Sequence, residues 1–328
     1  MKKIKILATG GTIAGKAASS TQLTGYTAGA YSVDDLLASV PALGELAQIS
    51  GEQLCNIDSS SITDALLLRL AQRCNELLAQ ENVDGVVITH GTDTMEETAF
   101  FLNLTVKSDK PVVLVGAMRP ATAISADGPL NIINAVKTAV CAESAGQGVL
   151  VVMNDEIYGG RDVMKTNTAN VATFKAPNGG ALGCIVGGEV RYYYRSVRPH
   201  TLAAEFVISN VTALPRVDII YAHIGQDRVL VDAACAAGAR GLVYAGSGMG
   251  SIHGAVEAAL AEAVQSGVVV VRSSRTGSGR VSAGLARWQE QGFLYADNLN
   301  PQKARLLLQL ALLQTHERSE VQELFLHY

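Results

Sequence analysis

Cysteine is scarce in this sequence and shows no pairing pattern. Its five cysteines are scattered along 328 residues without a C-x-x-C pair, and an odd number cannot all be joined within one chain. We therefore expect free, mostly buried thiols. Free thiols favour a cytoplasmic protein, with a periplasmic protein whose leader was removed before residue 1 as the alternative.

Long apolar runs and an excess of positive charge are also missing. Apolar runs such as residues 268–271 are far shorter than the roughly 20 residues of a membrane span. Thr9 and Gly10 interrupt the apolar stretch after the basic N-terminus, which indicates a strand rather than a signal peptide. The 26 lysines and arginines against 30 aspartates and glutamates give a net charge of -4. We expect a soluble protein that binds neither membranes nor nucleic acids.

Motifs of several common enzyme classes are absent. There is no G-x-S-x-G turn of α/β-hydrolases and no G-x-x-x-x-G-K-[ST] loop of nucleotide hydrolases. The stretch "GSGMGS" at residues 246–251 is similar to a dinucleotide fingerprint, but its third glycine comes one position early and the next strand ends in Arg272 rather than an acid. The six histidines lack the spacing of metal ligands. We expect neither a cofactor nor a metal.

What the sequence does contain is a regular alternation of strand and helix patterns. Polar caps or an early proline mark helix starts at Thr63, at Asp127 with Pro129, and at Asn300 with Pro301. This alternation predicts α/β architecture with a largely parallel sheet. Short runs of near-continuous apolar residues predict strands buried on both faces, at residues 4–8, 86–89, 112–115, 149–153, 217–221, 241–244 and 268–272.

The alternation is interrupted once. Residues 185–216 include "RYYYRSVRPH" and short polar stretches without a helical period, and the alternation resumes at Val217. A chain of 328 residues with 48% hydrophobic content can build two ordinary domains. We predict an N-terminal domain at residues 1–195, a linker at 196–214 and a C-terminal domain at 215–328.

Two predicted strands end in the same short pattern. Residues 9–12 and 89–92 both read Thr-x-Gly-Thr. Gly11 and Gly91 allow the backbone to approach a ligand closely, and ligands of open parallel sheets bind at the carboxyl ends of the strands. Two such turns on neighbouring strands would place Thr12 and Thr92 in one pocket.

A threonine hydroxyl becomes a nucleophile only when a neighbouring group activates it. Asp93 follows the second turn, and Lys165 lies in the polar stretch "GRDVMKTNTAN". A lysine held beside an aspartate and a threonine could accept the hydroxyl proton, and backbone N–H groups around Gly11 and Thr92 could bind an oxyanion. These residues outline an acyl-transfer site. Simpler interpretations are that Asp93 only caps a helix starting at Thr94 or Met95 and that Tyr26 is a packed ring.

Over essentially its whole length, the chain resembles the bacterial type II L-asparaginases. The stretches that carry the likeness are "ILATGGTIAG", "GYTAGAYSVDDLLASVP", "VVITHGTDTMEETAFFLNLTVKSDKPVVLVGAMRPATAISADGP", "VVMNDEIYGGRDVMKTNT" and "LNPQKARLLLQLAL". The resemblance implies two α/β domains: a larger N-terminal mixed sheet with helices on both faces, and a smaller, flavodoxin-like C-terminal parallel sheet. It also implies a cofactor-free homotetramer that hydrolyses L-asparagine to L-aspartate and ammonia, with L-glutamine as a secondary substrate. A glutaminase-asparaginase of near-equal preference and a non-catalytic amino-acid-binding protein are the alternatives.

The same resemblance implies roles for single residues. Thr12 is similar to the nucleophile that forms a β-aspartyl ester, and Tyr26 to the tyrosine that closes over the substrate and helps to activate it. Thr92, Asp93 and Lys165 resemble the group that assists proton transfer or positions the water.

Substrate contacts follow in the same way. Ser59 and Asp93 are similar to the residues that hold the α-carboxylate and α-ammonium, with Gly11, Gly91 and Thr92 beside them. The carbonyl of Ala117 resembles an acceptor for the amide nitrogen, and Ser251 a residue lent by a neighbouring subunit.

Two positions depart from the family pattern. Ser60 stands where the family commonly has a glutamine or glutamate that contacts the α-amine, and its shorter side chain is expected to hold the amine less directly. Near the C-terminus, "GRVSAGLARWQEQGF" offers only Glu290 in place of the acidic residue usually supplied by a partner subunit. Affinity and the preference for asparagine over glutamine are therefore expected to differ.

Overall fold

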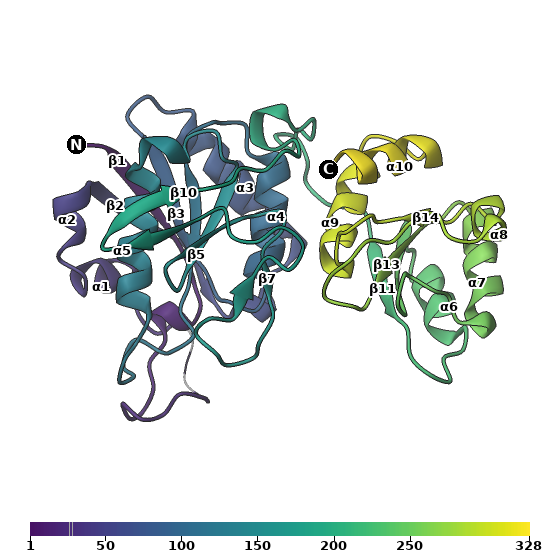
Figure 1. Cartoon of the computed structure of the whole chain (residues 1–328), viewed down its shortest axis with the longest axis horizontal. Helices are drawn as coiled ribbons and strands as arrows, with labels where there is room; N and C mark the ends of the chain where they lie inside the picture. Colours follow the sequence, from purple (N-terminus) through teal and green to yellow (C-terminus); the bar gives the residue numbers. More distant parts are fainter. Residues whose placement is uncertain (26, 28) are drawn as a thin grey trace. The chain divides into compact units, whose positions relative to one another are not determined.

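The chain forms two compact α/β units, which confirms the predicted fold class. The computed structural model describes residues 1–25, 27 and 29–328, and the units comprise Met1–Asn210 and Val211–Tyr328 (Figure 1). The finer domain limits, with a linker at 196–214, stay a prediction.

An eight-stranded mixed sheet forms the centre of the first unit. Its strand order is β10-β9-β6-β5-β4-β3-β1-β2. The strands from β1 to β5 are parallel, and β6, β9 and β10 pair antiparallel. Their bounds are β1 (Lys3–Gly10), β2 (Gln48–Ile57), β3 (Gly85–Thr89), β4 (Val112–Val115), β5 (Val149–Met153), β6 (Glu156–Gly159), β9 (Gly183–Val186) and β10 (Glu189–Tyr192).

Helices cover both faces of this sheet because its central strands are apolar on both sides. One face carries α1 (Val33–Ala38), α2 (Leu43–Leu46) and α5 (Gly128–Val140), and the other carries α3 (Asp64–Leu78) and α4 (Met95–Thr105) (Figure 1). Every residue of β3, β4 and β5 is buried. The strands β7 (Met164–Lys165) and β8 (Phe174–Lys175) form a separate two-stranded sheet.

The second unit is built on a four-stranded parallel sheet in the order β11-β12-β13-β14. One face packs against α6 and α7, with Trp288 of α8 in the same core, and the other against α9, which contacts α10. The strands are β11 (Val217–Tyr221), β12 (Gly241–Gly246), β13 (Val269–Ser274) and β14 (Leu294–Tyr295). The helices are α6 (Val229–Ala236), α7 (Gly254–Gln265), α8 (Ala286–Glu290), α9 (Pro301–Ala311) and α10 (Arg318–His327).

All strands predicted from the sequence are confirmed, as β1, β3, β4, β5, β11, β12 and β13. Two predicted helix caps are also confirmed: the Thr63 side chain accepts from the Leu66 amide and that of Asn300 from the Lys303 amide. The third differs, because the Asp127 side chain makes no cap hydrogen bond. Its carboxylate instead accepts from backbone amides of the loop after β4.

Local patterns missed the strands at the sheet edges. The edge strand β2 is only partly buried, β10 lies in the segment expected to be irregular, and β9 overlaps the start of that segment. Half-exposed edge strands lack the continuous apolar run that marks a central strand. The cysteines are free, as predicted, but only Cys74 is fully buried and the other four are partly exposed.

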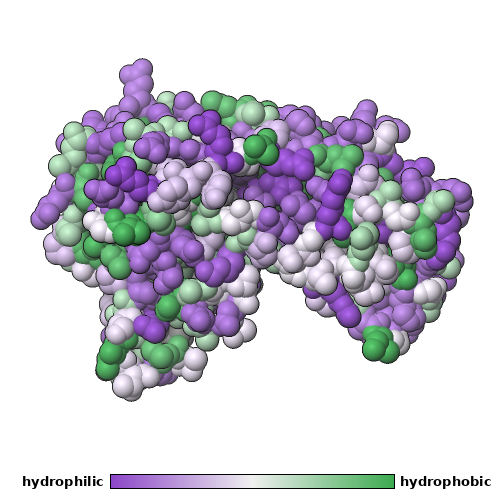
Figure 2. All heavy atoms as spheres, in the orientation of Figure 1, coloured by the Kyte–Doolittle hydropathy of each residue, from purple (hydrophilic) through white to green (hydrophobic). Residues whose placement is uncertain are grey.

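The surface mixes residue types. Figure 2 shows hydrophobic residues in small patches between hydrophilic ones on the visible face. Within the described residues, none of the helices combines the length and apolar character that a membrane crossing requires.

Candidate active site

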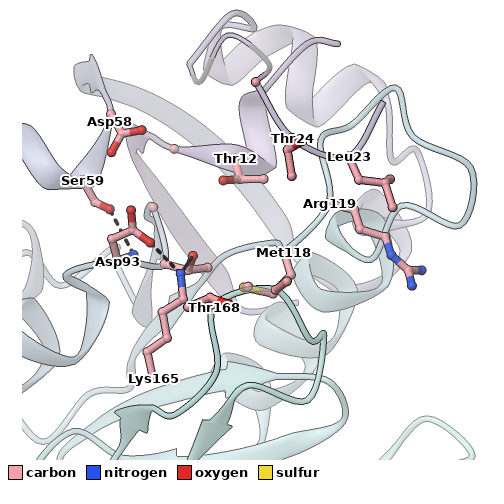
Figure 3. A pocket seen from close by; sticks show the side chains of 15 residues that line it. Thr12, Leu23, Thr24, Asp58, Ser59, Asp93, Met118, Arg119, Lys165 and Thr168 are labelled. Carbon is pink, nitrogen blue, oxygen red and sulfur yellow. Dashed lines mark hydrogen bonds and ion pairs between the residues drawn. The ribbon is translucent and has the colours of Figure 1, made fainter. Parts of the chain in front are cut away.

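A pocket of about 540 Å³ opens in the first unit where β1 and β3 end (Figure 3). Because these strands are parallel neighbours, their carboxyl ends lie at the same edge of the sheet. The two Thr-x-Gly-Thr turns therefore meet in one place. The lining residues are Gly11, Thr12, Leu23, Thr24, Gly25, Asp58, Ser59, Gly91, Thr92, Asp93, Met118, Arg119, Lys165, Thr168 and Ala169.

The first turn places Thr12 at the pocket wall. Gly10 and Gly11 adopt φ angles of 103° and 81°, a region that favours glycine, and Thr12 then begins a short 3₁₀ helix. The backbone N–H of Gly11 donates to the Ile57 carbonyl at 3.0 Å, so it is already occupied. Figure 3 shows the Thr12 hydroxyl directed toward the side that carries Ser59 and Asp93.

The second turn packs directly against the first. A Cβ atom on Gly11 would lie 2.4 Å from both the Cα and the N of Gly91, far inside van der Waals contact, so only glycine fits at this position. The Thr9 hydroxyl also donates to the Thr89 carbonyl at 2.9 Å. This close approach places Thr12 and Thr92 in one cavity, as the repeated pattern predicted.

The buried side chain of His90 connects the second turn to helix α4. Its Nδ1 lies 2.6 Å from the Gly91 carbonyl and its Nε2 lies 2.9 Å from the Thr98 hydroxyl. A carbonyl only accepts, so Nδ1 carries the proton and Nε2 accepts from Thr98. Burial lowers the pKa of His90 from 6.5 to about 4, so the ring is neutral at physiological pH.

The lowered pKa of His90 predicts an acid-sensitive fold. The unfolded chain binds a proton near pH 6.5 and the folded chain only near pH 4, so stability falls as the pH drops through this window. The free energy of unfolding should fall between pH 7 and pH 5. We expect this fall to be smaller in His90→Gln than in the wild type by roughly 1 to 2 kcal/mol. Urea unfolding at equal protein concentration measures it. The exposed His223 provides the control: if His223→Gln flattens the profile as much, His90 is not the titrating group.

Lys165 joins the second turn from a distant part of the chain. Its Nζ donates to Thr92 Oγ1 at 2.9 Å and to Asp93 Oδ1 at 2.5 Å, and its backbone N–H donates to Glu96 Oε2 at 2.8 Å. The lysine side chain is 16% exposed and that of Asp93 58%, so the ammonium is enclosed while the carboxylate remains open to a ligand.

The simpler interpretation of Asp93 as a helix cap is wrong. Helix α4 starts at Met95, and the side chain of its N-cap residue Thr94 makes no cap hydrogen bond. The Asp93 backbone N–H instead donates to Ser59 Oγ at 3.2 Å, and the Thr94 hydroxyl donates to the Ser59 carbonyl at 2.9 Å. Ser59 is thus buried and held against the second turn, as a substrate-binding residue would need to be.

The remaining predicted site residues either lie away from the pocket lining or fall outside the described residues. Ser60 bonds to the Asp58 carboxylate, Ala117 is buried one residue before the lining residue Met118, and neither is among the described residues that line the pocket. Ser251 belongs to the second unit, in a bridge with Ser247. Glu290 ends α8 of that unit. Tyr26 lies outside the described residues.

Several lining residues were missed in the sequence. Met118 and Arg119 follow β4, the next parallel strand of the same sheet, so the carboxyl-edge rule could have found them. Thr168 and Ala169 follow Lys165 in the β7–β8 connection. Asp58 directly precedes Ser59 and is the second carboxylate in the pocket.

The arrangement suits nucleophilic chemistry. The hydroxyl-bearing residues Thr12 and Thr92 line one cavity with a lysine and two aspartates. An activated hydroxyl beside a proton-transfer group is the pattern of covalent acyl transfer. Among the described residues, no group of three or more histidine, cysteine, aspartate or glutamate side chains could hold a metal ion.

Both units match models of known protein families. Residues 3–198 match the family model "Asparaginase, N-terminal", and residues 216–325 match "Glutaminase/Asparaginase C-terminal domain".

Individual relatives match over the whole chain. "L-asparaginase 2" of Bacillus subtilis is 51% identical, with 100% of this chain and 87% of the relative covered. "Glutaminase-asparaginase" of Pseudomonas fluorescens biotype A is 43% identical, with coverage of 100% and 91%. A solved structure, described as a probable cytoplasmic L-asparaginase from Campylobacter jejuni, is similar with a TM-score of 0.98 and 51% identity, and each chain is covered completely.

Proposed function

The chain belongs to the asparaginase family, and we propose that it is an amidohydrolase that converts L-asparagine to L-aspartate and ammonia. The observation that carries the proposal is the meeting of Thr12 with the Thr92, Asp93 and Lys165 group in one pocket. L-Glutamine is a secondary substrate in this proposal.

Thr12 acts as the nucleophile in the proposed reaction. Its hydroxyl oxygen attacks the side-chain amide carbon of asparagine, and the hydroxyl proton passes to the leaving nitrogen, so that ammonia departs and a β-aspartyl ester remains. Water then attacks the ester carbonyl, aspartate leaves with the new carboxylate, and the proton returns to Thr12. With the Gly11 amide occupied, the backbone around Thr92 is the remaining candidate donor to the oxyanion.

Lys165 and Thr92 provide the proposed path for protons. Lys165 Nζ donates to Thr92 Oγ1, which leaves the hydroxyl hydrogen of Thr92 free to point into the pocket. A hydroxyl held in this way can donate to the departing nitrogen and later orient the attacking water. Asp93 pairs with Lys165 through Oδ1, and its exposed carboxylate receives the substrate's α-ammonium.

Ammonia release from both amides tests the proposal. We expect turnover of L-asparagine with a higher kcat/KM than for L-glutamine, because the longer side chain shifts the amide carbon away from Thr12. A protein inert to asparagine, glutamine and succinamic acid would rule out the amidohydrolase. The second candidate function is a glutaminase-asparaginase, the name carried by a 43% identical relative. Near-equal kcat/KM values for the two amides would support this alternative.

A homotetramer with shared active sites is part of the proposal. Ser251 lies at a tight bridge after β12 in the second unit, and it is assigned to the pocket of a neighbouring subunit. A monomer in sedimentation equilibrium at assay concentration would contradict this role. The free cysteines and the relative described as probable cytoplasmic support the cytoplasm as the compartment, which cell fractionation tests.

A further inference from the structure

Asp58 brings a second carboxylate to the wall that would hold a substrate's charged groups. It lines the same pocket as Asp93 and directly precedes Ser59. Figure 3 shows Asp58 on the side of the pocket where Ser59 and Asp93 lie. Asp58 is exposed, so its carboxylate is accessible to a cationic group of a bound substrate.

Ser60 holds the Asp58 carboxylate in one orientation. Oδ1 of Asp58 accepts from the Ser60 backbone N–H at 2.9 Å and from the Ser60 hydroxyl at 2.8 Å. In the described part of the chain, these contacts all use Oδ1, so Oδ2 is left for a ligand. The Ser60 side chain therefore does not reach into the pocket itself but fixes its neighbour.

The two positively charged side chains that line the pocket, Lys165 and Arg119, contact residues other than Asp58. Lys165 pairs with Asp93 at 2.5 Å. Arg119 donates through Nη1 to the Ser125 carbonyl at 2.8 Å, and Figure 3 shows its guanidinium pointing away from Ser59 and Asp93. Among the described residues, Asp58 makes no salt bridge. The wall formed by Asp58 and Asp93 thus carries one more negative than positive charge and attracts a cationic group.

We propose that Asp58 determines specificity by accepting a hydrogen bond from the substrate's α-ammonium, together with Asp93. Ser60 is a positioning residue that aims the Asp58 carboxylate. This inference rests on the proposed asparaginase function. It also explains how a short serine at position 60 is compatible with an amino-acid substrate: the contact to the amine comes from the residue two positions earlier.

The test compares two substrates that differ only in the α-amine. L-Asparagine carries the α-ammonium and succinamic acid lacks it, while both present the same carboxylate and side-chain amide. We expect Asp58→Asn to lower kcat/KM for asparagine by about 10- to 100-fold, mainly through KM, since hydrogen bonds to charged groups have that magnitude. The kcat/KM for succinamic acid should change by less than about twofold, because it makes no contact that the variant removes.

Matched variants distinguish the contact between Asp58 and the α-ammonium from the general effect of removing a negative charge. Exposed Glu81 lies in the loop after α3, outside the pocket, and Glu81→Gln removes the same charge without an effect on either substrate. Ser60→Ala should lower the asparagine-to-succinamic acid ratio less than Asp58→Asn does, and Ser60→Thr, which keeps the hydroxyl, should restore it.

The kinetic results can contradict the roles of Asp58 and Ser60 separately. An equal fall for both substrates in Asp58→Asn, or no fall for either, overturns the role of Asp58. A ratio unchanged in Ser60→Ala overturns the positioning role. A wild-type protein that hydrolyses neither substrate contradicts the amidohydrolase function instead, so the two failures are distinguishable.

Discussion

Replacing Thr12 with alanine is expected to lower kcat for L-asparagine by at least about 10³-fold, since no covalent ester can form without the hydroxyl. Ammonia release under saturating substrate measures the loss. Acid quenching of the wild-type reaction followed by mass spectrometry should detect an aspartyl group attached to the peptide that contains Thr12, and this adduct should be absent from the variant.

The fold and the binding pocket should survive this change, because alanine has the same Cβ and Thr12 begins only a short 3₁₀ helix. Far-UV circular dichroism and calorimetric binding of L-aspartate check both. Thr12→Ser, which keeps a hydroxyl, should retain far more activity than the alanine variant. An alanine variant with wild-type turnover, or an adduct on another residue, would contradict the nucleophile assignment.

Replacing Lys165 with methionine is expected to lower kcat by about 10²- to 10⁴-fold, the range of general acid–base catalysis. Methionine keeps an unbranched stem but cannot donate to Thr92 Oγ1 or pair with Asp93. If Lys165 acts through Thr92, then Lys165→Met combined with Thr92→Val should lose little more activity than the single variants do. Steady-state kinetics of the four proteins measures this coupling.

Lys175 is the matched control for Lys165. It lies on the paired strand β8, and its half-exposed ammonium contacts Glu156 at 3.0 Å outside the pocket. A surface pair of this kind contributes little to stability, so Lys175→Met should keep wild-type kcat and KM. Similar losses in both lysine variants would show that the β7–β8 sheet, and not the Lys165 ammonium, is what catalysis requires.

Local sequence patterns were sufficient to predict the central strands and the two Thr-x-Gly-Thr turns of the site. The central strands are recognisable because each is a short apolar run buried on both faces. The two Thr-x-Gly-Thr turns are recognisable because glycine is needed where Gly11 and Gly91 touch. Spacing along the chain did not show that Lys165 reaches Thr92, since 73 positions separate them.

Short-range periodicity and glycine geometry were enough to predict the α/β class, the positions of the buried central strands and two hydroxyl-bearing turns at strand ends. The packing of distant segments then brought Lys165, Met118 and Arg119 into the same pocket as these turns. The tertiary structure also turned Asp127 from a helix cap into a support for the loop after β4, aimed Ser60 at Asp58 and paired Lys165 with Asp93. The Asp127 and Lys165 contacts depend on the packing of separate segments, which short-range periodicity does not encode, whereas the contact of Ser60 with Asp58 spans only two residues.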